Sequence, residues 1–182
     1  MKPAVLLLLS VVATIAAAAP QATPVVSPPP PLPVQFADRD LTIDRPADWR
    51  DSGIRGGGVQ VHLIGGVNGF PHFTIQSDAG AGLPFTVSPA SERHLVEELF
   101  STLIRSVSGT TVLNASWSGI NGLRVHDSMS VRPSAAGPIK VRRLLFLHAG
   151  VPYVLSWGAP ADEYETIAEQ VARCASSLRY SD

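Results

Sequence analysis

The sequence predicts an α+β fold, with an antiparallel β-sheet of about six or seven strands flanked by two main α-helices. Two patterns lead to this prediction. Several short segments alternate apolar and polar residues and are joined by glycine-rich turns, as is typical of antiparallel strands. Two longer segments, residues 88–107 and 161–178, instead carry apolar residues at helical spacing. The order along the chain is strands, a helix, a meander of strands and a final helix.

The first strand ends in the sequence TIDRPADW, at residues 42–49. Pro46 has no backbone N–H to donate to a neighbouring strand, so we expect the strand to end there. Trp49 follows within reach of the end of the sheet, where burial of its ring would stabilise the fold. We therefore interpret Trp49 as part of the core and not as part of a ligand-binding site.

The segment after Trp49 predicts a flexible turn followed by a hairpin. Residues 51–58 are rich in glycine, but they do not predict a phosphate-binding loop because a strand and not a helix follows them. Residues 59–63 and 70–76 alternate apolar and polar, with a glycine-rich turn between them. A loop rich in glycine and proline follows at residues 78–87.

The first helix is predicted to begin at Ser88, which suits the N-cap, with Pro89 at the first helical position. Glu92 lies near the positive end of the helix dipole, and Ser108 and Gly109 end the helix. We expect its apolar residues to bury one broad face. These residues are Leu95, Val96, Leu99, Phe100, Leu103, Ile104 and Val107.

The second half of the domain is predicted to be a meander of strands closed by a helix. A run of apolar residues at 144–147 has no polar face, which places its strand in the middle of a sheet covered on both sides. The acidic start of the last helix matches the helix dipole. The predicted strands are residues 111–117, ending in a turn at Ser118 and Gly119, then 123–131, 139–148 and 153–157, and the helix spans 161–178.

The first residues predict export. Lys2, an apolar run at residues 4–15 and the small residues after it are typical of a secretory signal peptide at residues 1–18, cleaved between Ala18 and Ala19. Residues 19–35 are rich in proline and predict an extended, disordered linker. Residues 36–182 then form a single domain. We expect a secreted, periplasmic protein with no transmembrane helix after cleavage.

The charge and cysteine content exclude several classes of protein. The formal net charge of −1 argues against nucleic acid or an anionic membrane as an electrostatic partner. With a single cysteine, Cys174, the chain has no internal disulfide. Cys174 lies in the apolar stripe of the last helix, where we expect it to pack as a small apolar residue and not as a reactive thiol.

His62 and His72 are the candidate metal ligands. They lie on the less apolar faces of two strands predicted to form a hairpin, so their imidazoles could meet and bind a metal. The alternative is two separate, partly exposed histidines, which is the more common arrangement. His94, with Glu97 and Glu98 at helical spacing, is interpreted as a polar surface cluster.

The basic residues Arg124, Lys140, Arg142 and Arg143 form the candidate site for an anion or an acidic partner, and Arg132 could approach them from a neighbouring strand. The alternative is that these residues pair with acids on adjacent strands. An inward Asp127 would be costly unless its carboxylate were hydrogen-bonded, so we interpret it as a hydrogen-bonded structural group or a residue at the edge of a strand.

No catalytic residues are predicted, and no cofactor. Ser156, in the sequence VLSWG, lacks the first glycine of the turn that holds the nucleophile of serine hydrolases. No other combination of a nucleophile and a base can be assembled from neighbouring residues, so we expect a protein that is not an enzyme.

The chain resembles the PsbP-like and DcrB-like domains, which with the Mog-type domains form a superfamily of α/β/α sandwiches. The resemblance covers about residues 36–180 and rests on three segments: LTIDRPADW, VPYVLSWGAP and CASSLRY. In that superfamily an early strand runs into a proline and a tryptophan, a late strand ends in an aromatic residue, and the closing helix ends in a serine followed by an aliphatic residue or phenylalanine. The matching residues here are Pro46, Trp49, Tyr153, Ser177 and Leu178. The chain departs from the pattern in having Ser177-Leu178 where Ser-Phe is more usual, and in its glycine-rich residues 51–58.

The resemblance implies a PsbP-like sandwich and, in most cases, a role other than catalysis. Members serve as photosystem subunits, small-GTPase binders, envelope proteins or chaperone-like adaptors, so fold alone does not select among these roles. We expect an envelope protein that binds a protein partner through a sheet edge, a loop or a helix face. The alternatives are a small-molecule or metal-binding protein that uses the pocket between sheet and helix, and an enzyme with a site of unrecognised type.

Overall fold

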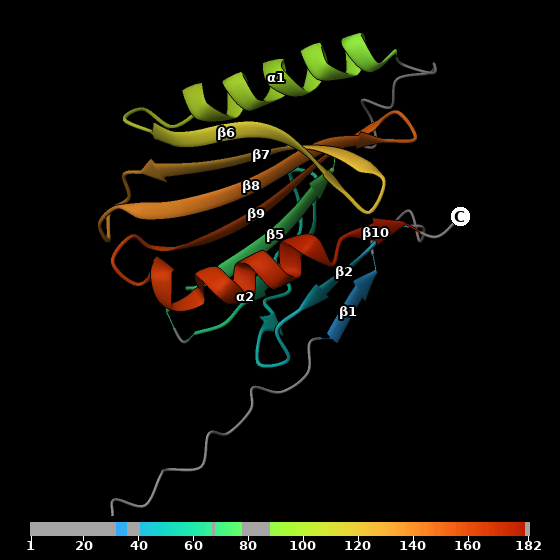
Figure 1. Ribbon diagram of the computed structural model, residues 1–182. Helices are drawn as coiled ribbons and strands as arrows, with labels where there is room; N and C mark the ends of the chain where they lie inside the picture. The colour runs from blue at the N-terminus through green and yellow to red at the C-terminus, as the bar shows by residue number, and fades with distance from the viewer. Residues whose placement is uncertain (1–31, 36–40, 67, 78–87, 181–182) are drawn as a thin grey trace, which may run out of the picture.

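The computed structural model describes residues 32–35, 41–66, 68–77 and 88–180. The predicted signal peptide, most of the predicted linker and the loop at 78–87 lie outside the described residues. Figure 1 shows the arrangement of the elements. In chain order they are β1 (Leu32–Gln35), β2 (Leu41–Arg45), β3 (Arg50–Asp51), β4 (Val59–Ile64), β5 (His72–Ser77), α1 (Pro89–Arg105), β6 (Thr111–Ile120), β7 (Leu123–Arg132), β8 (Ile139–His148), β9 (Val151–Pro160), α2 (Tyr164–Ser176) and β10 (Arg179–Tyr180).

The strands form an antiparallel sheet of seven strands in the order β3-β4-β5-β9-β8-β7-β6, and β1, β2 and β10 form a separate sheet of three. The two helices pack on opposite faces of the large sheet, because alternate residues of β8 contact one or the other. The predicted α+β fold, an antiparallel sheet of about seven strands flanked by two helices, is confirmed. The small additional sheet was not predicted.

The main core lies between the large sheet, the small sheet and α2. Leu144 and Phe146 of β8 face α2, whereas Leu145 between them faces α1. All three are fully buried. This explains the apolar run in β8: a strand covered on both faces needs apolar residues at every position.

Trp49 belongs to this core. Only 2% of its surface is exposed, and its backbone N–H donates to the Pro46 carbonyl in the turn that follows β2. Gly65 lies so close that a Cβ there would come within 2.8 Å of the Trp49 Nε1. The structural interpretation of Trp49 is therefore confirmed.

Two local predictions were wrong. Strand β6 does not end at Ser118 and Gly119 but continues to Ile120, and the turn uses Asn121 and Gly122, both with positive φ. An Asn-Gly pair is the standard sequence of a two-residue hairpin turn, so this signal was present but overlooked. The apolar face of α1 is not broadly buried either, because only Val96 among its residues is buried.

The start of the paired structure differs from the predicted start of the domain. Strand β1 lies at the end of the predicted proline-rich linker, and it pairs with β2 along its whole length. Paired structure therefore begins before residue 36. Within the described ranges, no helix has both the length and the apolar character needed to cross a membrane.

Candidate functional site: a polar hollow under the first helix

The face of the large sheet that carries α1 is unusually polar. Because side chains alternate along a strand, β5, β7, β8 and β9 each present every second residue to this face. In β5 these residues are polar, and in β7 they are serine, histidine or arginine. The polar set comprises His72, Thr74, Gln76, His126, Ser128, Ser130, Arg132, Arg143 and Ser156.

Helix α1 covers this face only in part. Val96 packs against Leu145 of β8 and Val154 of β9, and partly buried residues such as Leu99 and Leu103 complete the contact. Beside the last turn of α1 a hollow of about 230 Å³ remains open. Its lining includes His72, Thr74, Gln76, Leu103, Ser106, Val107, Arg132, Val141, Arg143, Val154 and Ser156.

Two arginines enter this hollow from neighbouring strands. Arg143 of β8 is only 8% exposed, and its Nη1 donates to the Ser130 Oγ at 2.8 Å. The Nε of Arg132, on β7, is buried and has no hydrogen-bond partner. Within the described part of the chain, neither guanidinium forms an ion pair with a carboxylate. Burial, together with the positive charge of Arg132, lowers the pKa of Arg143 to about 10.

His72 lies against the same group of residues. Burial is the main reason that its pKa falls to about 4, and the positive charges of Arg132, His62 and Arg143 act in the same direction. The imidazole is therefore neutral at pH 7. It sits directly over Gly158 of β9, where an added Cβ would approach the His72 Cε1 to 2.6 Å, so its position is fixed by the sheet.

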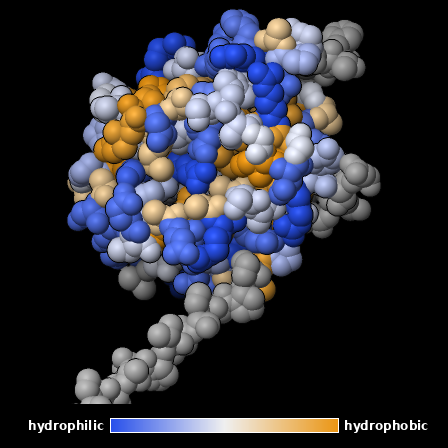
Figure 2. Space-filling model, in the orientation of Figure 1, coloured by the Kyte–Doolittle hydropathy of each residue, from blue (hydrophilic) through white to orange (hydrophobic). Residues whose placement is uncertain are grey.

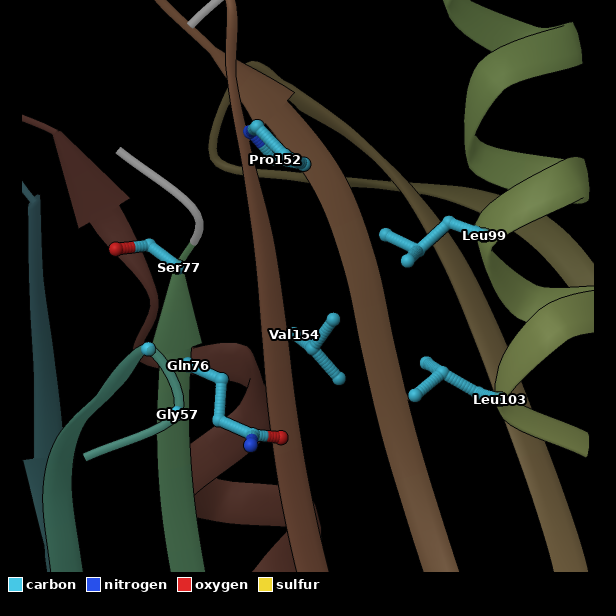
Figure 3. Close-up of a pocket in the computed structure, with 8 residues that line it drawn as sticks. Gly57, Gln76, Ser77, Leu99, Leu103, Pro152 and Val154 are labelled. Carbon is cyan, nitrogen blue, oxygen red and sulfur yellow. The ribbon is translucent and has the colours of Figure 1, made fainter. Parts of the chain in front are cut away.

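A second hollow, of about 290 Å³, adjoins the first. The two share Gln76, Leu103 and Val154 as lining residues, so they lie side by side between α1 and the sheet, and together they are called the groove below. In Figure 3, Leu99 and Leu103 point from α1 toward Val154, with Pro152 farther along the same strand. The groove thus has an apolar part next to α1 and β9 and a cationic part at the two arginines.

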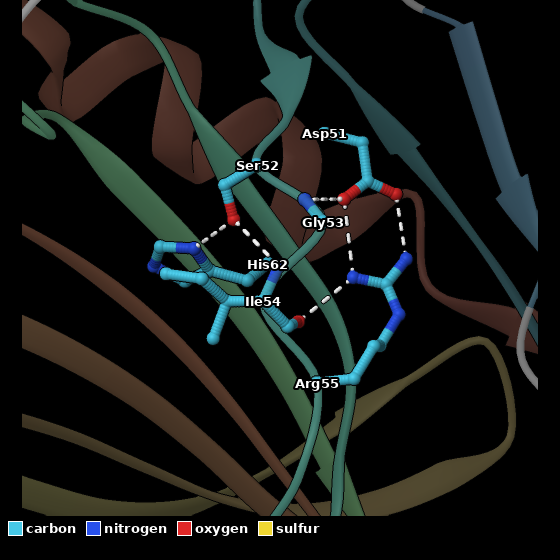
Figure 4. A network of polar contacts seen from close by, with 6 residues as sticks. All are labelled: Asp51, Ser52, Gly53, Ile54, Arg55 and His62. Atoms are coloured by element: carbon cyan, nitrogen blue, oxygen red, sulfur yellow. Dashed lines mark hydrogen bonds and ion pairs between the residues drawn. The ribbon is translucent and has the colours of Figure 1, made fainter.

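The predicted metal ligands His62 and His72 do approach each other. Their ring centroids are 6.0 Å apart, and they lie on adjacent strands of the β4–β5 hairpin. His62 is engaged elsewhere, because its Nδ1 is 2.6 Å from the Ser52 Oγ in the network that also holds Asp51 and Arg55 (Figure 4). Among the residues that the structure describes, no group of three His, Cys, Asp or Glu side chains could hold a metal.

The structure separates the predicted basic cluster. Lys140 and Arg142 face α2, where they pair with Glu165 and Asp127, respectively. Arg124 is exposed near the start of α1, with its guanidinium 4.8 Å from the ring of Trp117. Only Arg143 reaches the hollow, and its neighbour there is Arg132. The predicted pairing with an acid on an adjacent strand thus holds for Arg142, whereas the acid that pairs with Lys140 is on α2.

Other predictions about single residues are confirmed. Asp127 accepts two hydrogen bonds from Arg142, at 2.7 and 3.1 Å, so its inward position is satisfied. Cys174 is buried, and burial raises the pKa of its thiol to about 11, which makes it unreactive at neutral pH. His94 is exposed on α1, as expected for a surface cluster.

Strand β6 forms one edge of the large sheet and is unusually open. Among the strands that the structure describes, its only neighbour in the sheet is β7. Eight of its ten residues are exposed, among them Val112 at 39% and Leu113 at 53%, and none carries a charge. Figure 2 shows hydrophobic side chains gathered at the upper left of the molecule, where β6 begins in Figure 1. The opposite edge, β3, has two residues, both charged.

No protein-family model matches the chain, and no curated protein matches it either. Solved structures do. The chain is similar to cyanobacterial PsbP (CyanoP) from Synechocystis sp. PCC 6803, with a TM-score of 0.65 at 11% identity over 88% of this chain and 98% of that one. It is also similar to LpqN of Mycobacterium tuberculosis, described as involved in cell envelope biogenesis, with a TM-score of 0.54 at 12% identity over 84% and 91% of the two chains.

A variant of the protein Mog1 is a third similar structure, with a TM-score of 0.51 at 10% identity over 84% of this chain and 97% of that one. Identities this low establish the fold and nothing finer. The resemblance to PsbP-like and Mog-type domains is therefore confirmed at the level of the fold.

Proposed function

We propose that this chain is an exported, non-enzymatic protein of the cell envelope that binds an extended segment of a protein partner along the edge of β6. A partner strand would add to the large sheet next to β6 and form backbone hydrogen bonds with it, while side chains such as Leu113 select among partners. The proposal includes a periplasmic location, since the first residues are typical of a signal peptide.

The observation that carries this proposal is the open edge of β6. Proteins commonly protect such edges with charged residues, proline or a very short strand, because an unprotected edge pairs with other chains. The other edge, β3, follows this practice, whereas β6 has ten residues without charge or proline. The one irregularity in β6, a shift in register between Val112 and Asn114, leaves most of the strand regular.

One further observation supports the proposal. LpqN, one of the similar structures, is described as involved in cell envelope biogenesis.

The test is site-specific crosslinking in living cells. A photoreactive amino acid at Leu113 should crosslink to a single main partner, which mass spectrometry then identifies. Leu113→Lys and Val112→Lys, which place charge on the edge, should abolish recovery of that partner in a pull-down. Both positions are exposed, so folding stability should change by no more than about 0.5 kcal/mol.

Ile54 provides the matched control, because it is an exposed apolar residue away from β6, at 56% exposure. A photoreactive group there should not capture the partner, and Ile54→Lys should leave the pull-down unchanged. Crosslinks from Leu113 that join only two copies of this chain, or no protein above background, would contradict the proposal.

A second candidate function, binding of a small molecule, is favoured by a different observation: two arginines without a paired carboxylate line the groove under α1. Metal binding by His62 and His72 is a narrower version of this alternative. Metal binding by these two histidines would be established if the thermal midpoint rises with zinc in the native protein but not in His62→Ala or His72→Ala.

A further inference from the structure

We propose that the groove between α1 and the large sheet binds a single-chain anionic amphiphile, with its acidic head at Arg132 and Arg143 and its alkyl chain between α1 and β9. The ligand class is an acidic head group on an unbranched alkyl chain, such as a medium-chain carboxylate. This site lies on the α1 face of the sheet and does not depend on partner binding at β6.

The head-group end is defined by positive charge that the described protein residues do not neutralise. Arg143 is more than nine-tenths buried, and its only hydrogen bond to a side chain goes to the neutral Ser130 hydroxyl. Arg132 lines the same hollow with a buried, unpartnered Nε. A buried guanidinium next to a second, partly exposed one is costly unless an anion compensates the positive charge. A guanidinium pair is also well suited to a carboxylate or phosphate, because its N–H groups match two acceptor oxygens.

Neutral donors surround this position. The side chains of Thr74, Gln76 and Ser156 line the hollow beside the arginines and could donate to an anionic head. His72 is uncharged at neutral pH, for the reasons given above, so it neither adds to nor cancels the positive charge there. Such a combination of convergent polar groups within a concave site is typical of small-molecule pockets.

The alkyl end is defined by the second hollow, which adjoins the first. Gln76, Leu103 and Val154 line both, so in this proposal the alkyl chain of a molecule bound at the arginines passes these three residues to reach the second hollow. There it meets Leu99 and Leu103 of α1 on one side and Pro152 and Val154 of β9 on the other (Figure 3). The leucines are only half-buried in the free protein, so a bound chain would remove more of their surface from water.

Calorimetric titration of the full domain with acetate, butyrate, octanoate, decanoate and decyl phosphate tests the proposal. Each additional CH₂ that enters the groove should tighten the Kd roughly three- to fourfold. Acetate should bind weakly, decanoate should bind far more tightly, and decanol should bind more weakly than decanoate. Similar Kd values for decanoate and decyl phosphate would indicate a site for acidic heads in general, and a clear preference would identify the head group.

Variants localise the two ends. Arg132→Gln and Arg143→Gln should each weaken decanoate binding roughly tenfold or more, because a charge-assisted hydrogen bond is lost. Arg124→Gln is the matched control, since Arg124 lies on the same strand and sheet face as Arg132 but outside the groove, and its Kd should stay unchanged. Leu103→Ser should weaken decanoate binding but leave acetate binding as it is.

A second measurement uses no variant, so it tests the proposal even if the variants fold poorly. In the unmodified protein, methyl NMR signals of Leu103, Val107 and Val154 should shift on addition of decanoate, whereas those of Val171 in the other core should not. Absence of decanoate binding, equal Kd values for acetate and decanoate, or full binding by Arg143→Gln would each overturn the proposal.

Discussion

Gly58 illustrates how a single residue determines the local path of the chain beside the groove. Its φ of +78° lies in the left-handed region, and an added Cβ would come within 2.6 Å of the Ser77 carbonyl oxygen. Ser77 donates its N–H to the Gly58 carbonyl, so the two segments are held at this distance. The glycine is required here both for its backbone conformation and for its lack of a side chain.

Gly58→Ala should therefore lower the free energy of unfolding by more than the left-handed conformation alone costs, which is about 1–2 kcal/mol. Gly53→Ala is the matched control: its φ is +74°, but no atom lies within 4 Å of the added Cβ. Chemical denaturation of the two variants checks the difference. Equal destabilisation would show that the contact with Ser77 relaxes freely and that only backbone strain matters.

His72 should make stability depend on pH in a defined range. Burial, aided by Arg132, His62 and Arg143, lowers its pKa from 6.5 to about 4, so between these pH values the unfolded chain binds a proton that the folded protein does not. Stability should consequently fall as the pH drops from about 6.5 to 4, by roughly 2–4 kcal/mol, and show no contribution from His72 above that range.

Denaturation curves of the native protein and His72→Gln across this pH range measure that contribution. Between about pH 4 and 6.5, the free energy of unfolding of His72→Gln should depend less on pH than that of the native protein. Above about pH 6.5 the variant and the native protein should have the same slope, because His72 is neutral there in both the folded and the unfolded chain. A slope unaffected by His72→Gln would mean that His72 is more accessible to water than its position over Gly158 indicates.

At the residue scale, the sequence predicted part of the site. It identified Arg143 as a candidate for anion binding, but it grouped Arg143 with Arg142 and Lys140, which lie on the other face. Adjacent residues of a strand always point to opposite faces, so this separation could have been read from the alternation. The approach of Arg132 from a neighbouring strand was predicted, but the positions of Thr74 and Ser156 beside Arg143 could not be, because they depend on which strands pair and in which register.

At the scale of whole elements, the two helices differ in how firmly they are attached. Helix α2 buries Tyr164, Val171, Cys174 and Ala175, whereas α1 buries only Val96. Both helices have apolar stripes in the sequence, and a broad buried face was predicted for α1. For α1 this failed because the opposing sheet face is polar at its far end, and an apolar stripe cannot bury itself against arginine, threonine and glutamine.

Helix α1 should therefore open more readily than α2. Amide hydrogens in the middle of α1 should exchange roughly tenfold or more faster than those in the middle of α2, because fewer apolar contacts must break for local opening. Hydrogen–deuterium exchange followed by mass spectrometry resolves the two helices. Decanoate should slow exchange in α1 and leave α2 unchanged, and equal exchange rates in the free protein would refute this account of α1.

At the scale of the whole molecule, the fold class and the order of strands and helices along the chain followed from the alternating segments and the apolar stripes of the two helices, and the apolar run in β8 indicated a strand covered on both faces. The small sheet did not follow from the sequence, because β1 and β10 are short, and β10 pairs with β2 from the other end of the domain. The proline-rich composition before residue 36 also concealed β1. Pro33 is compatible with a strand there because β1 lies at the edge of its sheet, where a missing N–H costs little.

The final prediction concerns this small sheet. A chain that begins at residue 36 should be less stable than one that begins at residue 31, because it lacks the pairing of β1 with β2 and the contact of Val34 with the core. We expect a loss of about 1–3 kcal/mol, from partial burial of Val34 and the backbone hydrogen bonds of one short strand. Thermal unfolding of the two chains measures the difference, with the chain that begins at residue 31 as the reference.

Loss of β1 should also affect the end of the chain, because β2 pairs with β10 after α2. We expect faster amide exchange at Arg179 and Tyr180 in the chain that begins at residue 36. Equal midpoints for the two chains would show that β1 contributes no stability and that the folded domain begins at β2.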